Sequence, residues 1–105
     1  MIEITQAELF IIESNFHRKF VYFSNNTVEG LISQYLKISI SKWLKADSTP
    51  FYSGRILNNK ADYKGENEDL VCFDYAESIE DIVVLLIQWI KDTTEELTII
   101  SSEIS

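Results

Sequence analysis

Apolar positions near the N-terminus follow the period of a helix. They fall at Leu9, Ile12, Phe16, Phe20 and Phe23, three or four residues apart. Just before them, residues 5–8 form a capping box, in which the Thr5 hydroxyl accepts from the Glu8 backbone N–H and the Glu8 carboxylate accepts from the Thr5 N–H. On this spacing the helix runs to Ser24. It can equally end near Asn15, because the aromatic and β-branched types at 19–23 favour a strand.

The next apolar stretch predicts a second helix over 28–45. After the break at Asn25 and Asn26, apolar side chains share one broad arc at helical spacing. They are Val28, Leu31, Ile32, Tyr35, Leu36, Ile40 and Trp43. Trp43 is therefore expected in the core. Residues 36–41 also alternate with the period of two that is typical of a strand, so this helix has a competing interpretation.

A hairpin is predicted in the middle of the chain. Pro50 ends the preceding element, because proline disfavours helical geometry in the residue before it. The β-prone segments 51–57 and 70–75 then flank a polar tip at 58–69 that contains Gly65. Two short antiparallel strands joined by this tip are the simplest interpretation.

A third helix is predicted over 79–93. Ser78 is a capping residue with Asp81 at the third helical position. The buried stripe comprises Ile79, Ile82, Val83, Leu86, Trp89 and Ile90. Val84 and Leu85 fall inside or beside the polar stripe, where a helix that faces only one core does not need apolar residues. Residues 97–101 are β-prone and predict a short C-terminal edge strand.

These elements predict an α+β fold. Two or three helices would pack on a short antiparallel sheet within a single small domain that spans residues 1–105. A chain of 105 residues with 46% apolar content suits one core and is too short for two ordinary domains. The alternative is an all-α helical bundle in which the first helix runs to Ser24.

Cysteine content and hydropathy predict the cellular setting. The single Cys72 allows no intrachain disulfide and lies in an apolar strand, so we expect a buried, inert thiol. The N-terminus has no basic region ahead of an apolar stretch. The longest apolar run, 82–87, is far shorter than the roughly 20 residues that cross a bilayer. We therefore expect a cytoplasmic protein with no membrane partner.

Residue types that carry catalysis or bind metals are scarce. Metal sites and catalytic triads need several imidazole, thiolate or paired groups, and His17 is the single histidine. If Gly65 is set at the sixth position of a calcium loop, Lys60 and Val71 occupy the first and last ligand positions, which abolishes the EF-hand pattern. The glycines form no phosphate-binding spacing. The expectation is a protein that is not an enzyme and needs no cofactor or metal.

Negative charge is concentrated in the second half of the chain. From Gly65 onward there are eleven acidic residues and one base, Lys91, whereas residues 1–64 hold eight bases and six acids. Such a polarised field attracts a basic partner and repels nucleic acid. We therefore expect a basic protein partner and no nucleic acid.

The acidic residues are interleaved with aromatic ones, and together they predict a binding face. Its members are Asp62, Tyr63, Glu66, Glu68, Asp69, Asp74, Tyr75, Glu77, Asp81 and Val84. Aromatic side chains would supply burial in such an interface, while the charges would steer association and set register. The competing interpretation is an ordinary solvated charged surface.

Three segments resemble the colicin DNase immunity family. The run T-Q-A-E-L-F at 5–10 is similar to the T-E-A-E-F-L that starts the family's first helix, and D-L-V-C-F-D at 69–74 is similar to its D-L-I-Y-Y-P. Ser78, Ile82-Val83 and Trp89 resemble its S-P-x-G-I-V motif and the tryptophan that follows it. Cys72 and Phe73 stand where that family has the tyrosine pair that anchors the toxin.

A second likeness is to the barstar-like nuclease inhibitors. Residues 76–78, the helix that follows and the segment 97–101 resemble the C-terminal helix and last strand of that family. Both resemblances imply an immunity protein that neutralises a cognate toxin domain, with carboxylates taking the place of nucleic-acid phosphates. They imply an intracellular inhibitor. Separately, we expect a monomer or weak dimer. The alternative is a non-inhibitory adaptor or secretion chaperone, which would share the small size and the acidity.

Overall fold

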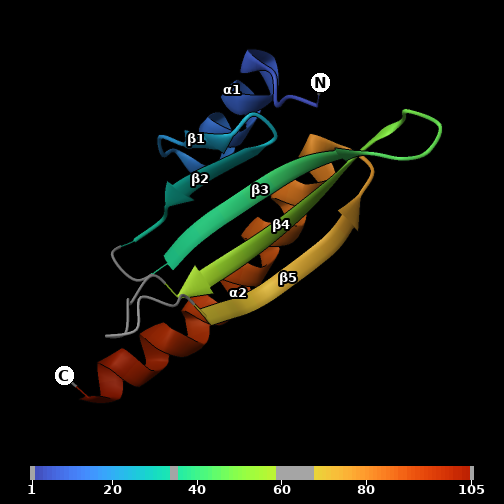
Figure 1. Ribbon diagram of the computed structural model, residues 1–105. Coiled ribbons are helices and arrows are strands. Elements are labelled where there is room, and N and C mark those ends of the chain that lie inside the picture. Colours follow the sequence, from blue (N-terminus) through green and yellow to red (C-terminus); the bar gives the residue numbers. More distant parts are fainter. Residues whose placement is uncertain (1, 34–35, 59–67, 105) are drawn as a thin grey trace.

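Two helices and a five-stranded antiparallel sheet make up the part of the protein that the structure describes (Figure 1). The computed structural model describes the backbone of residues 2–33, 36–58 and 68–104, and the side chains of these residues except 68 and 94–104. The elements in chain order are α1 (Gln6–Phe16), β1 (Val21–Ser24), β2 (Thr27–Leu31), β3 (Leu36–Leu44), β4 (Pro50–Asn58), β5 (Glu68–Ala76) and α2 (Ile79–Ile104). The predicted α+β class is confirmed, and the all-α alternative is wrong.

The strands form a meander in the order β1-β2-β3-β4-β5, and every neighbouring pair is antiparallel. α2 crosses behind the sheet in the view of Figure 1, packs against β4 and β5, and contacts α1. One face of the sheet is therefore covered by helix, and no described helix covers the opposite face, which we call the uncovered face.

The capping box at the start of α1 is formed as predicted. The Glu8 backbone N–H donates to Thr5 Oγ1 at 3.1 Å, and the Thr5 N–H donates to Glu8 Oε1 at 2.9 Å. The helix ends at Phe16, because His17 adopts a left-handed conformation with φ of 56° and its N–H donates to the Glu13 carbonyl at 2.8 Å. β1 follows, so the interpretation in which the first helix continues to Ser24 is wrong.

The helix predicted over 28–45 is also wrong, because these residues form β2 and β3. The two strands pair from Thr27 opposite Ser41 to Leu31 opposite Lys37. The residues follow the competing period of two, which places Ile38 and Ile40 in the core. Trp43 lies on the opposite side of the sheet, where no described helix covers it, and is 42% exposed. The expectation that Trp43 is a core residue is therefore wrong.

The predicted hairpin is confirmed as β4 and β5, which are longer than expected. The register between them shifts near Tyr52 and again near Ile56. Most of the predicted polar tip lies outside the described residues.

α2 begins where the sequence indicates and ends later than predicted. The Asp81 backbone N–H donates to the Ser78 hydroxyl at 3.1 Å, which caps the helix. The helix then runs to Ile104, so the predicted end at 93 and the strand at 97–101 are both wrong. No glycine or proline interrupts this segment, and β-branched residues alone disfavour a helix only weakly.

A single cluster of buried side chains joins both helices to the covered face of the sheet. It comprises Ile4, Leu9, Ile12, Phe20, Val28, Ile38, Ile40, Tyr52, Ile56, Ala76, Ile79, Ile82, Val83 and Leu86. Trp89 packs against this cluster and is partly buried, as expected for a residue on the apolar stripe of its helix. α2 approaches β4 closely at Gly54, where a Cβ atom would lie 2.9 Å from Ile82 Cγ1.

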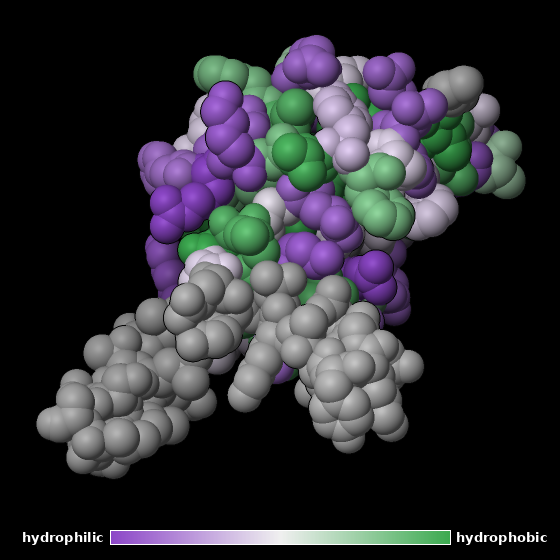
Figure 2. All heavy atoms as spheres, turned by 60° about the vertical axis from the view of Figure 1, so that its left-hand side comes forward, coloured by the Kyte–Doolittle hydropathy of each residue, from purple (hydrophilic) through white to green (hydrophobic). Residues whose placement is uncertain are grey.

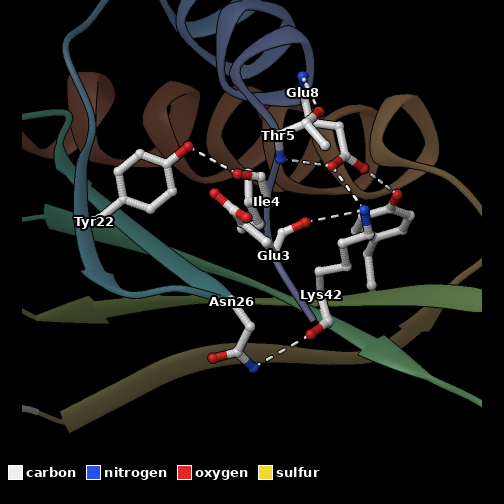
Figure 3. A network of polar contacts seen from close by, with 8 residues as sticks. Glu3, Ile4, Thr5, Glu8, Tyr22, Asn26 and Lys42 are labelled. Carbon is white, nitrogen blue, oxygen red and sulfur yellow. Dashed lines mark hydrogen bonds and ion pairs between the residues drawn. The ribbon is translucent and has the colours of Figure 1, made fainter. Parts of the chain in front are cut away.

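Polar contacts fix α1 against the sheet (Figure 3). The Lys42 ammonium donates to Glu8 Oε1 at 2.9 Å and to the Glu3 carbonyl at 3.1 Å, and the Tyr52 hydroxyl donates to Glu8. The Tyr22 hydroxyl donates to the Ile4 carbonyl at 2.8 Å.

Neither helix, in the part of the chain that the structure describes, offers an apolar stretch of the length that a bilayer span requires.

Candidate functional site

Four of the predicted binding residues meet in one surface depression. It lies where β5 passes into α2 and has a volume of about 360 Å³. Its lining consists of Tyr75, Ala76, Glu77, Asp81, Val84 and Leu85, which we call the acidic–aromatic face. The sequence placed Tyr75, Glu77, Asp81 and Val84 in the binding set; Ala76 and Leu85 are additions from the structure.

Helical geometry aims the α2 members of this face outward. Ile82, Val83 and Leu86 are buried in the core, so residues 81, 84 and 85 lie on the other side of the helix. Val84 is 64% exposed and Leu85 38% exposed. The unusual apolar position that the sequence pattern indicated at 84 is therefore confirmed as a solvent-facing one.

Tyr75 is held in place by its neighbours. Its ring stacks on that of Phe51, with 5.5 Å between centroids and an interplanar angle of 25°. The Lys45 ammonium lies over the Tyr75 ring, 5.0 Å from the ring centroid, in a cation–π contact. The hydrogen bond with Tyr75 raises the pKa of Lys45, so this cation stays charged. An aromatic ring that is ordered before binding loses little freedom when a partner covers it.

The carboxylates of this face are available to a partner. Glu77 and Asp81 are exposed, and among the described residues neither has a cationic group within ion-pair distance. Asp81 lies in the first turn of α2, where the helix dipole stabilises negative charge. Lys45 interacts electrostatically with Glu77 without forming an ion pair, and the charge of Asp81 remains free to attract a cation.

The other predicted members of the binding set lie elsewhere. Asp69 pairs with Arg55 at 3.8 Å, and Asp74 lines a separate hollow on the uncovered face of the sheet. The side chain of Glu68 is outside the described part of the structure. Asp62, Tyr63 and Glu66 also lie outside the described residues.

Cys72 is exposed, so the expectation of a buried core thiol is wrong. Side chains alternate across β5, which sends Val71 and Phe73 toward the core and leaves Cys72 on the uncovered face. Its Sγ donates to Asp74 Oδ1 at 3.3 Å. Desolvation by partial burial and the neighbouring Asp74 carboxylate both raise the pKa of this thiol.

The sequence interpretation missed the hollow on the uncovered face of the sheet. It has a volume of about 400 Å³ and is lined by residues from all five strands. Its lining includes four hydroxyl side chains, of which that of Ser39 is buried: Thr27, Ser39, Ser41 and Ser53. Along β3, Ser39 and Ser41 alternate with Ile38 and Ile40 of the core, a pattern that indicates a separate polar face only when 36–44 is assigned to a strand.

The described surface carries no extended apolar area on the side shown in Figure 2, where hydrophilic and hydrophobic side chains are interspersed. Within the described residues, no group of three or more His, Cys, Asp or Glu side chains is placed to hold a metal ion.

Comparisons with protein-family models, curated proteins and solved structures found no match.

Proposed function

We propose that this protein is an immunity protein that binds a basic nuclease toxin domain through the acidic–aromatic face and thereby neutralises it. The observation that carries the proposal is the meeting of exposed apolar groups, Val84 and Leu85, with the fixed Tyr75 ring and two unpaired carboxylates.

The chemistry of this face suits a protein partner. Tyrosine and exposed aliphatic groups supply the desolvated centre of an interface, and surrounding carboxylates supply charge complementarity. An acidic surface repels nucleic acid and attracts a basic protein. Nuclease domains bind phosphates with cationic side chains, so a carboxylate-rich surface competes for the same groups.

The face is also built on rigid elements. Asp81 lies in the first turn of α2, which Ser78 caps, and Val84 and Leu85 lie in the next turn. The Tyr75 ring is stacked on Phe51. Pre-organisation of this kind lowers the entropic cost of association. The resemblances to nuclease-inhibitor families support the choice of an inhibitor over a generic adaptor.

The partner can be identified by affinity capture from the native host, followed by a nuclease assay of the captured protein with and without this chain. The proposal expects a basic protein whose nuclease activity falls as the complex forms. A captured partner with no toxic activity would overturn the inhibitor assignment and favour an adaptor or secretion chaperone.

Matched charge reversals test the face itself. Asp81→Lys should slow association and weaken its salt dependence, because long-range charge acts mainly on the association rate. Asp92→Lys changes the charge of the same helix by the same amount at an exposed position outside the face, and should have little effect. Equal effects of the two substitutions would show that total charge, and not this face, governs binding.

A further inference from the structure

The uncovered face of the sheet contains a second candidate binding site, independent of the acidic–aromatic face. We call it the hydroxyl hollow and define its floor as Thr27, Ser39, Ser41 and Ser53. Both helices lie on the other side of the sheet, so no described helix covers this floor (Figure 1). Its volume of about 400 Å³ lies within the range of pockets that hold small molecules.

Strand register explains why the face is hollow at its centre. Thr27 is opposite Ser41, and Ser41 is opposite Ser53, so one row across three strands carries only short hydroxyl side chains. In the next row Ser39 lies between Glu29 and Arg55. Short side chains in the middle and longer ones around them leave the depression.

Aromatic rings stand at the edge of this floor. Phe23 is 74% exposed, and Trp43 lines the same hollow. The Trp43 indole N–H donates to Ser53 Oγ at 2.8 Å, which fixes the ring beside the hydroxyls. A water-exposed ring that is ordered in this way, as that of Trp43 is, offers apolar surface to a ligand at a low entropic cost.

The charges around the floor largely neutralise one another. Glu29 pairs with Lys37 at 3.7 Å, and Arg55 pairs with Asp69 at 3.8 Å. An anionic ligand would therefore have to displace the partner of Arg55, and it would also meet the Asp74 carboxylate, which lines the hollow and accepts from the Cys72 thiol. The planar charged groups can still hydrogen-bond a neutral ligand while they remain paired.

We propose that the hydroxyl hollow binds an uncharged carbohydrate of one or two sugar rings. Hydroxyl side chains both donate and accept hydrogen bonds, as sugar hydroxyls do, so each can serve the other. A purely apolar ligand would leave the floor desolvated without partners, which is costly. The apolar C–H face of a sugar ring matches the exposed aromatic rings at the edge.

Two residues act as positioning and contact groups for such a ligand. Ser41 is bonded to Thr27 with 2.8 Å between their oxygens, which leaves one of the two protons free to donate outward. Ser53 accepts the Trp43 N–H and keeps its own proton for a ligand oxygen.

Tryptophan fluorescence offers a direct test. The protein is titrated with neutral mono-, di- and trisaccharides of glucose, mannose, galactose and N-acetylglucosamine, and affinity is confirmed by calorimetry. At least one sugar should give a saturable change in emission. Trp43→Phe should abolish that change while Trp89 remains in place. If no sugar in the panel binds, or if a nucleotide or a short basic peptide binds this hollow instead, the carbohydrate assignment is overturned.

Matched variants locate the binding. Ser41→Ala should weaken it by tenfold or more, whereas Ser14→Ala makes the same chemical change at an exposed position on α1 and should leave it unaltered. Asp81→Lys, which alters the acidic–aromatic face, should also leave sugar affinity unaltered. Equal losses for Ser41→Ala and Ser14→Ala would contradict the assignment. Circular dichroism of each variant checks that a loss does not come from unfolding.

Discussion

Lys42 on β3 forms an ion pair with Glu8 on α1 at 2.9 Å, and both side chains are mostly buried (16% and 14% exposed). The same Glu8 carboxylate accepts from the Thr5 backbone N–H (Figure 3). It also accepts from the Tyr52 hydroxyl. One side chain therefore caps α1 and docks it on the sheet. An isolated helix of 11 residues is marginal in water, so these tertiary contacts help to hold α1 in place.

The Glu8 network predicts a specific pH dependence of stability. Burial alone would raise the pKa of Glu8, but hydrogen bonds from Thr5, Tyr52 and Lys42 outweigh it and hold that pKa below its ordinary value of 4.5. The folded state thus favours the ionised form. Its contribution to the free energy of unfolding is complete above the ordinary pKa and is lost as pH falls through the lower folded value.

We therefore expect Glu8→Gln to lower the free energy of unfolding at pH 7 by about 1.5 to 3 kcal/mol, the usual worth of hydrogen bonds to a charged group. The difference from the unsubstituted protein should shrink as pH falls below 4.5 and through the lowered pKa of folded Glu8, because Glu8 of the unsubstituted protein then becomes protonated. Urea denaturation at several pH values measures this. Glu3→Gln is the control at an exposed side chain, and a difference that stays constant with pH would contradict the role of Glu8 ionisation.

A close approach of β2 to Phe20 predicts a second effect. A Cβ atom at Gly30 would lie 2.8 Å from Phe20 Cδ1, inside the contact distance of the ring. Gly30→Ala should therefore destabilise the protein by about 1 to 3 kcal/mol through overpacking. Phe20→Leu removes the ring, so the double variant should lose less stability than the sum of the two single ones. Simple additivity in chemical denaturation would show that the two sites do not clash.

The two tryptophans should respond differently to truncation. Trp89 packs against the core, whereas Trp43 lies on the uncovered face of the sheet. Trp89→Ala is expected to cost about 3 kcal/mol, the lower end of the range for aromatic truncation in a core. Trp43→Ala should cost less than about 1 kcal/mol, the worth of its one hydrogen bond and a partly exposed ring. Equal losses in thermal unfolding would be inconsistent with the different burial of the two rings.

Short sequence motifs predicted where the helices begin, whereas the pairing of distant strands determined the rest of the fold. The caps at Thr5 and Ser78 act over three residues, so both helix starts were readable from the sequence. Residues 28–45 satisfied a helical arc and, in part, a strand alternation. The choice between them depends on hydrogen bonds from β3 to β4, whose partners lie up to 22 residues away, as for Leu36 and Asn58.

The candidate sites divide in the same way. Tyr75, Glu77, Asp81 and Val84 are close along the chain, so their grouping followed from a short segment. Asp69 and Asp74 were assigned to the same face on charge alone, and strand geometry places them elsewhere. The hydroxyl hollow combines residues of separate strands through register, which no local pattern carries.

Cys72 provides a chemical probe of the uncovered face. The thiolate is the reactive form of cysteine, and burial together with the Asp74 carboxylate raises the pKa of this thiol despite its exposure. Asp74→Asn removes the negative charge 3.3 Å from Sγ, so the thiol pKa should fall and alkylation by iodoacetamide at pH 7.5 should become about threefold to tenfold faster. Asp92→Asn makes the same change at a remote site on α2 and should leave the rate as it was. If Asp74→Asn leaves the alkylation rate unchanged over pH 6.5 to 9.5, the carboxylate does not control this thiol.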